Sequence, residues 1–334
     1  MNTDGANAEA PDRNLALDLV RVTESAALAA SRWMGRGDKE GADAAAVDAM
    51  RKMLESVEMD GTVIIGEGEK DEAPMLYNGE RVGTGNPPGV DIAVDPVDGT
   101  RLRAEGRPGS LAVLAAAPAG TMFDPGPLVY MHKMVVGPAA ADEIDIDAPI
   151  ADNLARVARA NGKDVRDLVV VMLDRDRHEG FKKEVREAGA RLQLITDGDV
   201  AGAVMAAWEA KSDIDMLLGI GGTPEGVTSA CAVKALGGRI LGKVWPRNDE
   251  ERALATEQGY DVDQVLDTDD LVRSEDCFFA CTGITPGQLV AGVTFDGRGA
   301  TTETLMMRGK SGTVRVVTAR HRLSKLREYA SVEY

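Results

Sequence analysis

The chain has 334 residues, of which 44% are hydrophobic, so it can form one large or two medium globular units with a packed core. Its 38 basic and 55 acidic residues give a formal net charge of −17, which argues against nonspecific binding to nucleic acid or to an anionic membrane. Three cysteines and three histidines favour neither a disulfide framework nor a multi-histidine zinc centre. Without a run typical of a signal peptide or a membrane span, we expect a reduced, cytoplasmic protein.

Taken in chain order, the predicted elements change character near the middle of the sequence. Residues 1–12 are small and polar and are expected to form a disordered tail. Apolar residues at helical spacing then predict two helices, from about Leu15 and from about Ala44. Four apolar runs that follow are predicted strands, at 61–65, 89–95, 110–118 and 127–137.

From about Val169 strands and helices alternate. The predicted strands are 168–173, 191–196 and 213–222, and the predicted helices 178–189, 199–210 and 224–238. This alternation indicates βαβ units and a sheet covered on both faces. We therefore expect an α/β protein with two subdomains, an N-terminal α+β subdomain over 13–165 and a C-terminal α/β subdomain over 166–334.

Two predicted strands of the first half are each followed by glycines and acids, as "GEGE" at 66–69 and "DPVDGT" at 95–100. Asp95 and Asp98 would repel each other and resist desolvation, so a cation is expected beside them. Several carboxylates with few histidines indicate a hard divalent ion such as Mg²⁺ or Mn²⁺. Singly, Asp98 is as well explained as a turn or N-cap residue and Glu67 as a solvated loop acid. Their recurrence at two strand ends favours a metal site.

The second half adds anion-binding features. "GIGGTPEGV" at 219–227 leads from a strand into a helix, and a helix N-terminus attracts anions. Glu225 in that first turn is also explained as a simple partner of the helix dipole. Arg175 and Arg177 follow another strand and are suited to phosphate, or are equally well surface charges. The glycine-rich segments match neither the dinucleotide nor the Walker pattern, so nucleotide binding is not expected.

The segment "DPVDGT" resembles the signature of the lithium-sensitive sugar and inositol phosphatases. "GTVIIGEGEKDEAPMLY", "TDGDVAG", "GIGGTPEGV" and "TETLMMRGKSGTVR" are similar to the bacterial class II fructose-1,6-bisphosphatases of the GlpX type, over about residues 13–327. The resemblance implies a layered α/β/α/β/α sugar-phosphatase fold and a homodimer or homotetramer. It also implies hydrolysis of the C1 phosphate of fructose 1,6-bisphosphate, a step of gluconeogenesis that yields fructose 6-phosphate.

The same resemblance implies the site residues. The metal ligands would be Asp43, Glu67, Asp95, Asp98 and Glu225, holding Mg²⁺ or Mn²⁺. Thr100 would orient the attacking water, and Glu67 and Asp95 would complete the catalytic set, with Glu67 assisting in removing its proton. Substrate contacts would be Lys39, Asp98, Gly99, Thr100, Tyr130, Arg175, Asp176, Arg177, Asp197, Gly198, Asp199 and Gly222. Arg101 departs from the wider superfamily, in which Thr or Ser is common, and receives no role.

Three other functions are compatible with the sequence. A sedoheptulose-1,7-bisphosphatase, or an enzyme acting on both bisphosphates, would differ in pocket depth. An inositol monophosphatase would not need a second phosphate clamp. The third is a noncatalytic sugar-phosphate sensor. Asp95, Thr100 and Glu225 speak against it, because together they indicate an oriented water, for which a sensor has no use.

Overall fold

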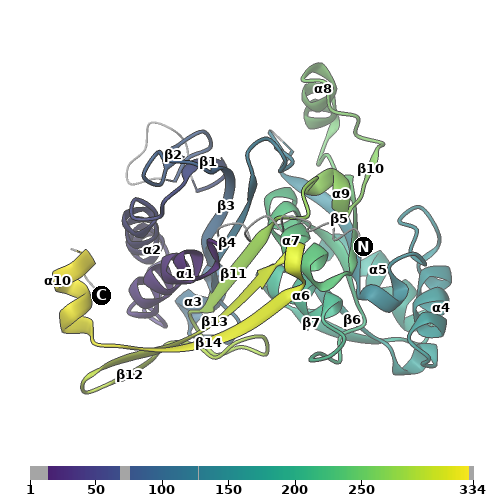
Figure 1. The fold of residues 1–334 in the computed structure, drawn as a ribbon. Coiled ribbons are helices and arrows are strands. Elements are labelled where there is room, and N and C mark those ends of the chain that lie inside the picture. Colours follow the sequence, from purple (N-terminus) through teal and green to yellow (C-terminus); the bar gives the residue numbers. More distant parts are fainter. Residues whose placement is uncertain (1–13, 68–75, 127, 331–334) are drawn as a thin grey trace, which may run out of the picture.

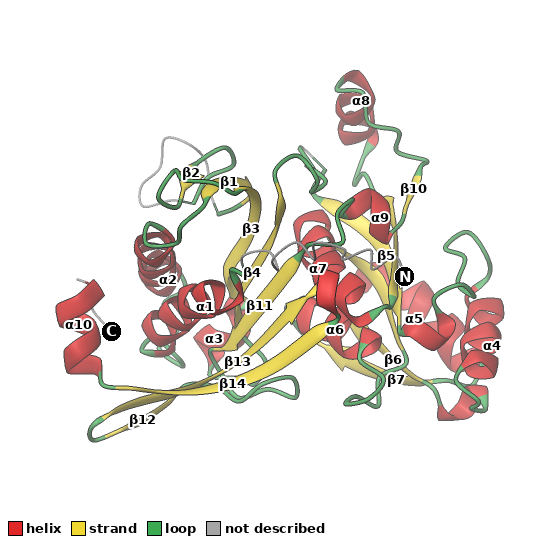
Figure 2. Cartoon of the chain, in the orientation of Figure 1, coloured by secondary structure: helices red, strands yellow, loops and turns green. Residues whose placement is uncertain are grey.

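The central strands of two β-sheets are buried at successive residues, and so on both faces, which requires helices on both sides of each sheet. The structure, a computed structural model, describes residues 14–67, 76–126 and 128–330, so the predicted tail lies outside the described residues. Figures 1 and 2 show the two sheets with helices on their outer faces and between them. In the described part, no helix combines the length and the apolar character needed to cross a bilayer.

The first sheet joins strands from both ends of the chain. Its order is β12-β13-β11-β4-β3-β1-β2, with β14 on the other side of β13. Only β1 and β3 run parallel to each other. The bounds are β1 Asp60–Ile65, β2 Arg81–Val82, β3 Gly89–Asp98, β4 Leu111–Pro118, β11 Phe278–Gly283, β12 Thr294–Asp296, β13 Gly299–Arg308 and β14 Thr313–His321.

The second sheet has the order β10-β9-β5-β8-β6-β7. Strand β6 is parallel to both β7 and β8, which confirms the predicted βαβ units. Strand β5 is antiparallel to its neighbours β8 and β9, so the sheet as a whole is mixed. The bounds are β5 Tyr130–Val136, β6 Val169–Leu173, β7 Arg191–Ile195, β8 Met216–Gly222, β9 Arg239–Val244 and β10 Val265–Leu266.

The helices supply the other three layers. Their bounds are α1 Ala16–Ser31, α2 Glu40–Leu54, α3 Thr100–Glu105, α4 Ile150–Ala160, α5 Glu179–Glu187, α6 Val200–Ala207, α7 Thr223–Leu236, α8 Asp249–Glu257, α9 Thr268–Leu271 and α10 Leu323–Ala330. Short 3₁₀ turns lie at η1 Pro138–Ala140, η2 Val165–Asp167, η3 Asp176–His178 and η4 Gly309–Ser311.

Alternation along the strands shows how the layers pack. In β3, Ile92 joins the core under α1 and α2, while Ala93 joins the core that contains α6 and α7. That central core also receives Val171 of β6, so α6 and α7 lie between the two sheets. Met172, the next residue of β6, packs with α4 and α5 on the far side. The layers are therefore α/β/α/β/α, which confirms the predicted fold class.

The two halves of the chain exchange strands. Strand β5, from the predicted N-terminal subdomain, lies in the middle of the second sheet, and β11–β14 return from the C-terminal half to the first. The division near residue 165 is thus not the division between the sheets, and it stays a prediction about folding units. Apolar periodicity identifies a buried strand but not the sheet in which the strand pairs.

A glutamate, Glu24, is buried between helix α1 and the first sheet. Glu24 of α1 is only 7% exposed and accepts a hydrogen bond from Thr302 Oγ1 of β13 at 3.2 Å. Desolvation raises the pKa of Glu24 from its ordinary 4.5 to about 7, against the lowering effects of Thr302 and Arg21. The folded state therefore holds a proton that the unfolded chain releases at lower pH.

We expect Glu24→Gln to unfold at a higher temperature than the parent protein at pH 8. The contribution of the protonated acid is fully present below pH 4.5 and is lost as the pH rises through about 7. The difference in unfolding free energy, on the order of 3 kcal/mol at pH 8, should shrink toward pH 5. Calorimetry at both pH values measures it, and a difference independent of pH would contradict the prediction.

Candidate active site

Most of the predicted site residues line one cavity of about 310 Å³, where strands of both sheets end. The predicted residues that line it are Glu67, Asp95, Asp98, Gly99, Thr100, Tyr130, Arg175, Arg177, Asp197, Gly198, Asp199, Gly222 and Glu225. They come from the ends of β1, β3, β6, β7 and β8, the start of β5 and the first turns of α3 and α7. The structure thus brings together acids and arginines that lie far apart in the sequence.

The signature segment is part of a strand rather than a loop after it. Strand β3 continues through Asp98, and its pairing with β4 is irregular between Asp95 and Asp98. Asp95 Oδ1 accepts a hydrogen bond from the Val97 N–H at 3.0 Å. The Asp98 carbonyl accepts one from Ser110 Oγ at 2.9 Å. The first bond orients the Asp95 carboxylate and the second fixes the Asp98 backbone; both residues line the cavity, and Asp98 is only 3% exposed.

Glycine is required immediately after Asp98. Gly99 has φ 76°, in the left-handed region, and begins the short helix α3. The next residue, Thr100, donates its hydroxyl hydrogen to the Val97 carbonyl at 3.0 Å. Because that hydrogen is committed, the hydroxyl oxygen meets the cavity as an acceptor, able to receive a hydrogen bond from a water.

The turn between β7 and α6 closes against this segment. Gly198 has φ 64°, and a Cβ there would lie 2.8 Å from Asp98 Oδ2. Asp197 Oδ2 accepts a hydrogen bond from the Arg101 N–H at 3.1 Å, which ties the turn to the start of α3. The Arg101 side chain is exposed and pairs with Glu105 one helical turn away, so this residue contributes its backbone to the site.

Both arginines after β6 are fixed in the cavity wall. Arg175 donates to the Thr196 carbonyl at 2.6 Å and pairs with Asp197 at 3.2 Å. Arg177 donates twice to the Ile220 carbonyl, at 3.1 and 2.8 Å, and lies 4.9 Å from the centroid of the Tyr130 ring. Neither is a free surface charge, which was the alternative that the sequence left open.

Three predicted residues do not line the cavity. Asp176 is exposed at the start of η3. Lys39 is exposed immediately before α2, and Asp43 lies in the first turn of that helix. Asp43 is nevertheless close enough for its charge to raise the pKa of Glu67, so it belongs to the edge of the same acidic group.

The sequence did not reveal Arg103, which holds the start of α2, and with it Asp43, in place. Arg103 is a residue of α3 whose side chain is fully buried. It donates to the carbonyls of Asp38 at 2.6 Å and Lys39 at 3.0 Å. It also approaches Asp43 Oδ1 at 3.4 Å. A helix arginine usually lies at the surface, so no sequence signal distinguished this one.

The five predicted metal ligands share one electrostatic property. Desolvation is the largest cause that raises the pKa of each, namely Asp43, Glu67, Asp95, Asp98 and Glu225. Repulsion follows: Asp98 and Glu67 raise the pKa of Asp95, and Asp199 and Glu225 raise that of Asp98. A bound cation would reverse both effects, because it replaces water around the carboxylates and neutralises their charge.

The residues present fit a hard divalent ion. Among the described residues no three His, Cys, Asp or Glu side chains converge as a finished metal site, so the carboxylates would have to close around an ion. However, Asp98 Oδ2 is buried without any hydrogen-bond partner, and every candidate ligand is a carboxylate oxygen. Oxygen donors in that number are what Mg²⁺ and Mn²⁺ prefer.

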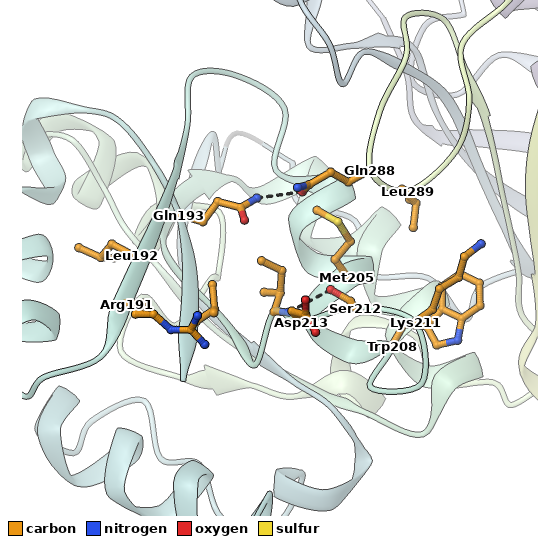
Figure 3. A pocket seen from close by; sticks show the side chains of 12 residues that line it. Arg191, Leu192, Gln193, Met205, Trp208, Lys211, Ser212, Asp213, Gln288 and Leu289 are labelled. Carbon is orange, nitrogen blue, oxygen red and sulfur yellow. Dashed lines mark hydrogen bonds between the residues drawn. The ribbon is translucent and has the colours of Figure 1, made fainter. Parts of the chain in front are cut away.

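A larger cavity lies elsewhere and lacks this chemistry. It has a volume of about 610 Å³ and lies beside β7 and α6, where Gln193 and Gln288 are hydrogen bonded (Figure 3). Asp213 is the one acid in its lining, against Arg191 and Lys211. Size alone would select this cavity, but the clustered carboxylates and both Arg175 and Arg177 line the smaller one.

We expect Gly198→Ala to lower activity at least tenfold, because its Cβ would displace the Asp98 carboxylate. The matched control is Gly189→Ala at the other end of β7, where φ is 93° but no atom lies within 4 Å of the added Cβ. Both variants should lose about 1 kcal/mol of stability to backbone strain. Equal activity in the two variants would contradict the role of the close approach.

Comparison with known proteins places these observations in one family. Residues 13–321 match the family described as bacterial fructose-1,6-bisphosphatase, glpX-encoded. The chain is 47% identical over 326 residues to fructose-1,6-bisphosphatase 1 class 2 of Escherichia coli strain K12, covering 94% of this chain and 96% of that protein. Fructose-1,6-bisphosphatase class 2 of Shigella flexneri is similar to the same extent, again at 47% identity over 326 residues.

Proposed function

The chain belongs to the glpX-encoded family of bacterial fructose-1,6-bisphosphatases, and from this we propose that it hydrolyses the C1 phosphate of fructose 1,6-bisphosphate. The products are fructose 6-phosphate and phosphate, in a step of gluconeogenesis. The observation that carries the proposal is that one cavity is lined by clustered carboxylates together with Arg175, Arg177 and Tyr130. A bisphosphate has the matching arrangement of two separate anions.

The chain is a metal-dependent phosphatase, for which we propose Mg²⁺ or Mn²⁺. Glu67, Asp95, Asp98 and Glu225 would hold it, with Asp43 at the edge. When bound, the metal supplies Lewis-acid neutralisation of the phosphate and lowers the pKa of a water. Mg²⁺ and Mn²⁺ remain equal candidates, because both accept a site made of carboxylate oxygens.

The protein's own groups position the reactants. Thr100 accepts a hydrogen bond from the attacking water, since its hydrogen is already donated to the Val97 carbonyl. Glu67, beside the other acids of the cavity, is the proposed acceptor of the water's proton, and Asp95 is the third member of the catalytic set. Most of the rate acceleration then comes from orientation and charge neutralisation, because the chain provides no covalent nucleophile in this scheme.

Arg175, Arg177 and Tyr130, with the starts of α6 and α7, would hold the sugar and the distal phosphate. The Arg177 guanidinium lies over the Tyr130 ring, a cation–π contact that would restrain it for paired contacts with phosphate. The N–H groups at the starts of α6 and α7 add donors beside Gly198, Asp199 and Gly222. Lys39, exposed before α2, could reach a phosphate only from outside the described cavity wall.

The remaining alternatives separate by substrate. Sedoheptulose 1,7-bisphosphate has the same two phosphates and is the nearest second substrate. An inositol monophosphatase has no use for Arg175 and Arg177 as a second clamp, and a sensor has no use for Thr100. We further propose a homodimer or homotetramer in the cytoplasm, both taken from the family resemblance.

Phosphate release from fructose 1,6-bisphosphate tests the function directly. We expect turnover with Mg²⁺ or Mn²⁺, no turnover after exhaustive chelation and recovery when Mn²⁺ is returned. Comparison of kcat/KM for fructose 1,6-bisphosphate, sedoheptulose 1,7-bisphosphate and an inositol monophosphate separates the alternatives. Activity that survives chelation would contradict the metal dependence, and efficient hydrolysis of the monophosphate alone would contradict the bisphosphate clamp.

We expect Thr100→Val to lower kcat about 10²-fold or more, because it preserves the shape of the side chain but removes the acceptor for the water. Mn²⁺ affinity, measured by calorimetry, should stay within a factor of two or so, since the hydroxyl is not a proposed ligand. Thr121→Val is the control, because its hydroxyl also donates to a carbonyl three residues back, that of Pro118, but does not line the cavity. Unchanged turnover in Thr100→Val would eliminate the proposed role.

A further inference from the structure

A lysine lies buried beneath the cavity that the proposed function uses. Lys133 is in the middle of β5, is 1% exposed and points to the same face of the sheet as its apolar neighbours Met131 and Val135. A lysine is almost never this buried unless it is paired. The apolar run at 127–137 predicts a strand but assigns Lys133 no role.

The Lys133 ammonium is fully engaged by two groups of the cavity wall. Nζ lies 3.1 Å from Asp199 Oδ1 and 2.9 Å from Oδ2, and it donates to the Gly222 carbonyl at 3.0 Å. Asp199 precedes α6 and Gly222 precedes α7, so one cation joins the two helix N-termini that line the site. Both residues are predicted substrate contacts.

The surrounding backbone leaves room for this side chain only because it is glycine. A Cβ at Gly221 would lie 2.9 Å from Lys133 Cε and 3.1 Å from Nζ, and 2.1 Å from Asp199 Oδ2. At Gly226 of α7 an added Cβ would lie 3.9 Å from Lys133 Cδ, an ordinary contact, so the close approach is specific to Gly221. Within the glycine-rich segment at 219–227, Gly221 therefore makes room for the Lys133–Asp199 pair.

The charge of Lys133 acts on the acids as well. Its positive charge opposes the rise in the pKa of both Asp98 and Glu225, so it lies within electrostatic range of two proposed metal ligands. Arg175 and Arg177 are partly exposed in the lining of the cavity, whereas Lys133 is enclosed. A fixed positive charge under the site weakens the attraction for a divalent cation and strengthens it for an anionic sugar phosphate.

We propose that Lys133 is a positioning residue that holds Asp199 and the Gly222 carbonyl in their substrate-binding arrangement and sets the balance between metal and substrate affinity. This inference rests on the proposed function of the cavity. It differs from a purely structural role, in which removing the lysine would loosen the site and weaken every ligand together.

The test is Lys133→Met, which keeps the length of the side chain and removes the charge. We expect the dissociation constant for Mn²⁺, measured by titration in the absence of substrate, to fall several-fold. The KM for fructose 1,6-bisphosphate at saturating Mn²⁺ should rise about tenfold or more, because truncating a buried charge pair leaves Asp199 unpaired. Opposite changes in the two affinities support the proposal, and parallel weakening or no change in either overturns it.

A matched control is available at the opposite end of β8, the strand that ends at Gly222. Lys163 pairs with the buried Asp215 at 2.6 Å, and Asp215 immediately precedes β8, whereas Gly222 ends it. Lys163→Met also removes a lysine from a buried aspartate, so it should lower thermal stability but leave the Mn²⁺ affinity and the KM unchanged. A shift of both affinities in this control would mean that loss of any such pair disturbs the site, which overturns the proposal.

A second variant covers the case in which Lys133→Met does not fold. Lys133→Arg keeps the charge but changes the donor geometry, so Mn²⁺ affinity should stay near that of the parent while KM rises. Tighter or much weaker Mn²⁺ binding in this variant would contradict the charge argument. Absence of turnover in the parent protein would instead reject the proposed function, and the Mn²⁺ titrations would still separate charge from packing.

Discussion

The site depends on an electrostatic constraint: carboxylates that raise one another's pKa must nevertheless be held close together. Burial makes each charged form less favourable, and the neighbouring acids add repulsion. Side chains alone would relieve this by turning away. The backbone limits this movement, because Asp95 and Asp98 belong to β3. That strand is paired with β1 on one edge and with β4 on the other. A rigid support of this kind keeps the carboxylates near one another, so that only side-chain movements are needed for them to close around a cation.

The two-sheet architecture explains why the opposing groups meet. The acids of β3 belong to the first sheet, and the arginines after β6 and the turns before α6 and α7 belong to the second. Helices α6 and α7 pack against both sheets and hold them together. Strand ends from both sheets line the same cavity. Strand β5 contributes Tyr130 at its start and Lys133 further along, although the chain order places it with the first half. The exchange of strands therefore builds the site rather than merely linking two units.

Cations and glycines then adjust the details within this frame. Arg103 ties the start of α2 to α3 through the Asp38 and Lys39 carbonyls, and Lys133 joins the starts of α6 and α7. Gly198 and Gly221 allow the carboxylates of Asp98 and Asp199 to approach the backbone. A net charge of −17 is thus compatible with an anionic substrate, because the buried positive charges act locally.

The βαβ units, the layered fold class and most of the residues that line the cavity could be predicted from the sequence. Apolar periodicity and glycines beside acids are local signals, and a family resemblance extends them to specific positions. Three features depend on packing between distant segments and could not be predicted: β5 pairs in the second sheet, β3 continues through Asp98, and Arg103 and Lys133 are buried beside the site. Lys133 did leave a signal, a charge inside an apolar run. Its partners, however, lie 66 and 89 residues further along the chain, and a contact of that range is set by packing rather than by neighbouring residues.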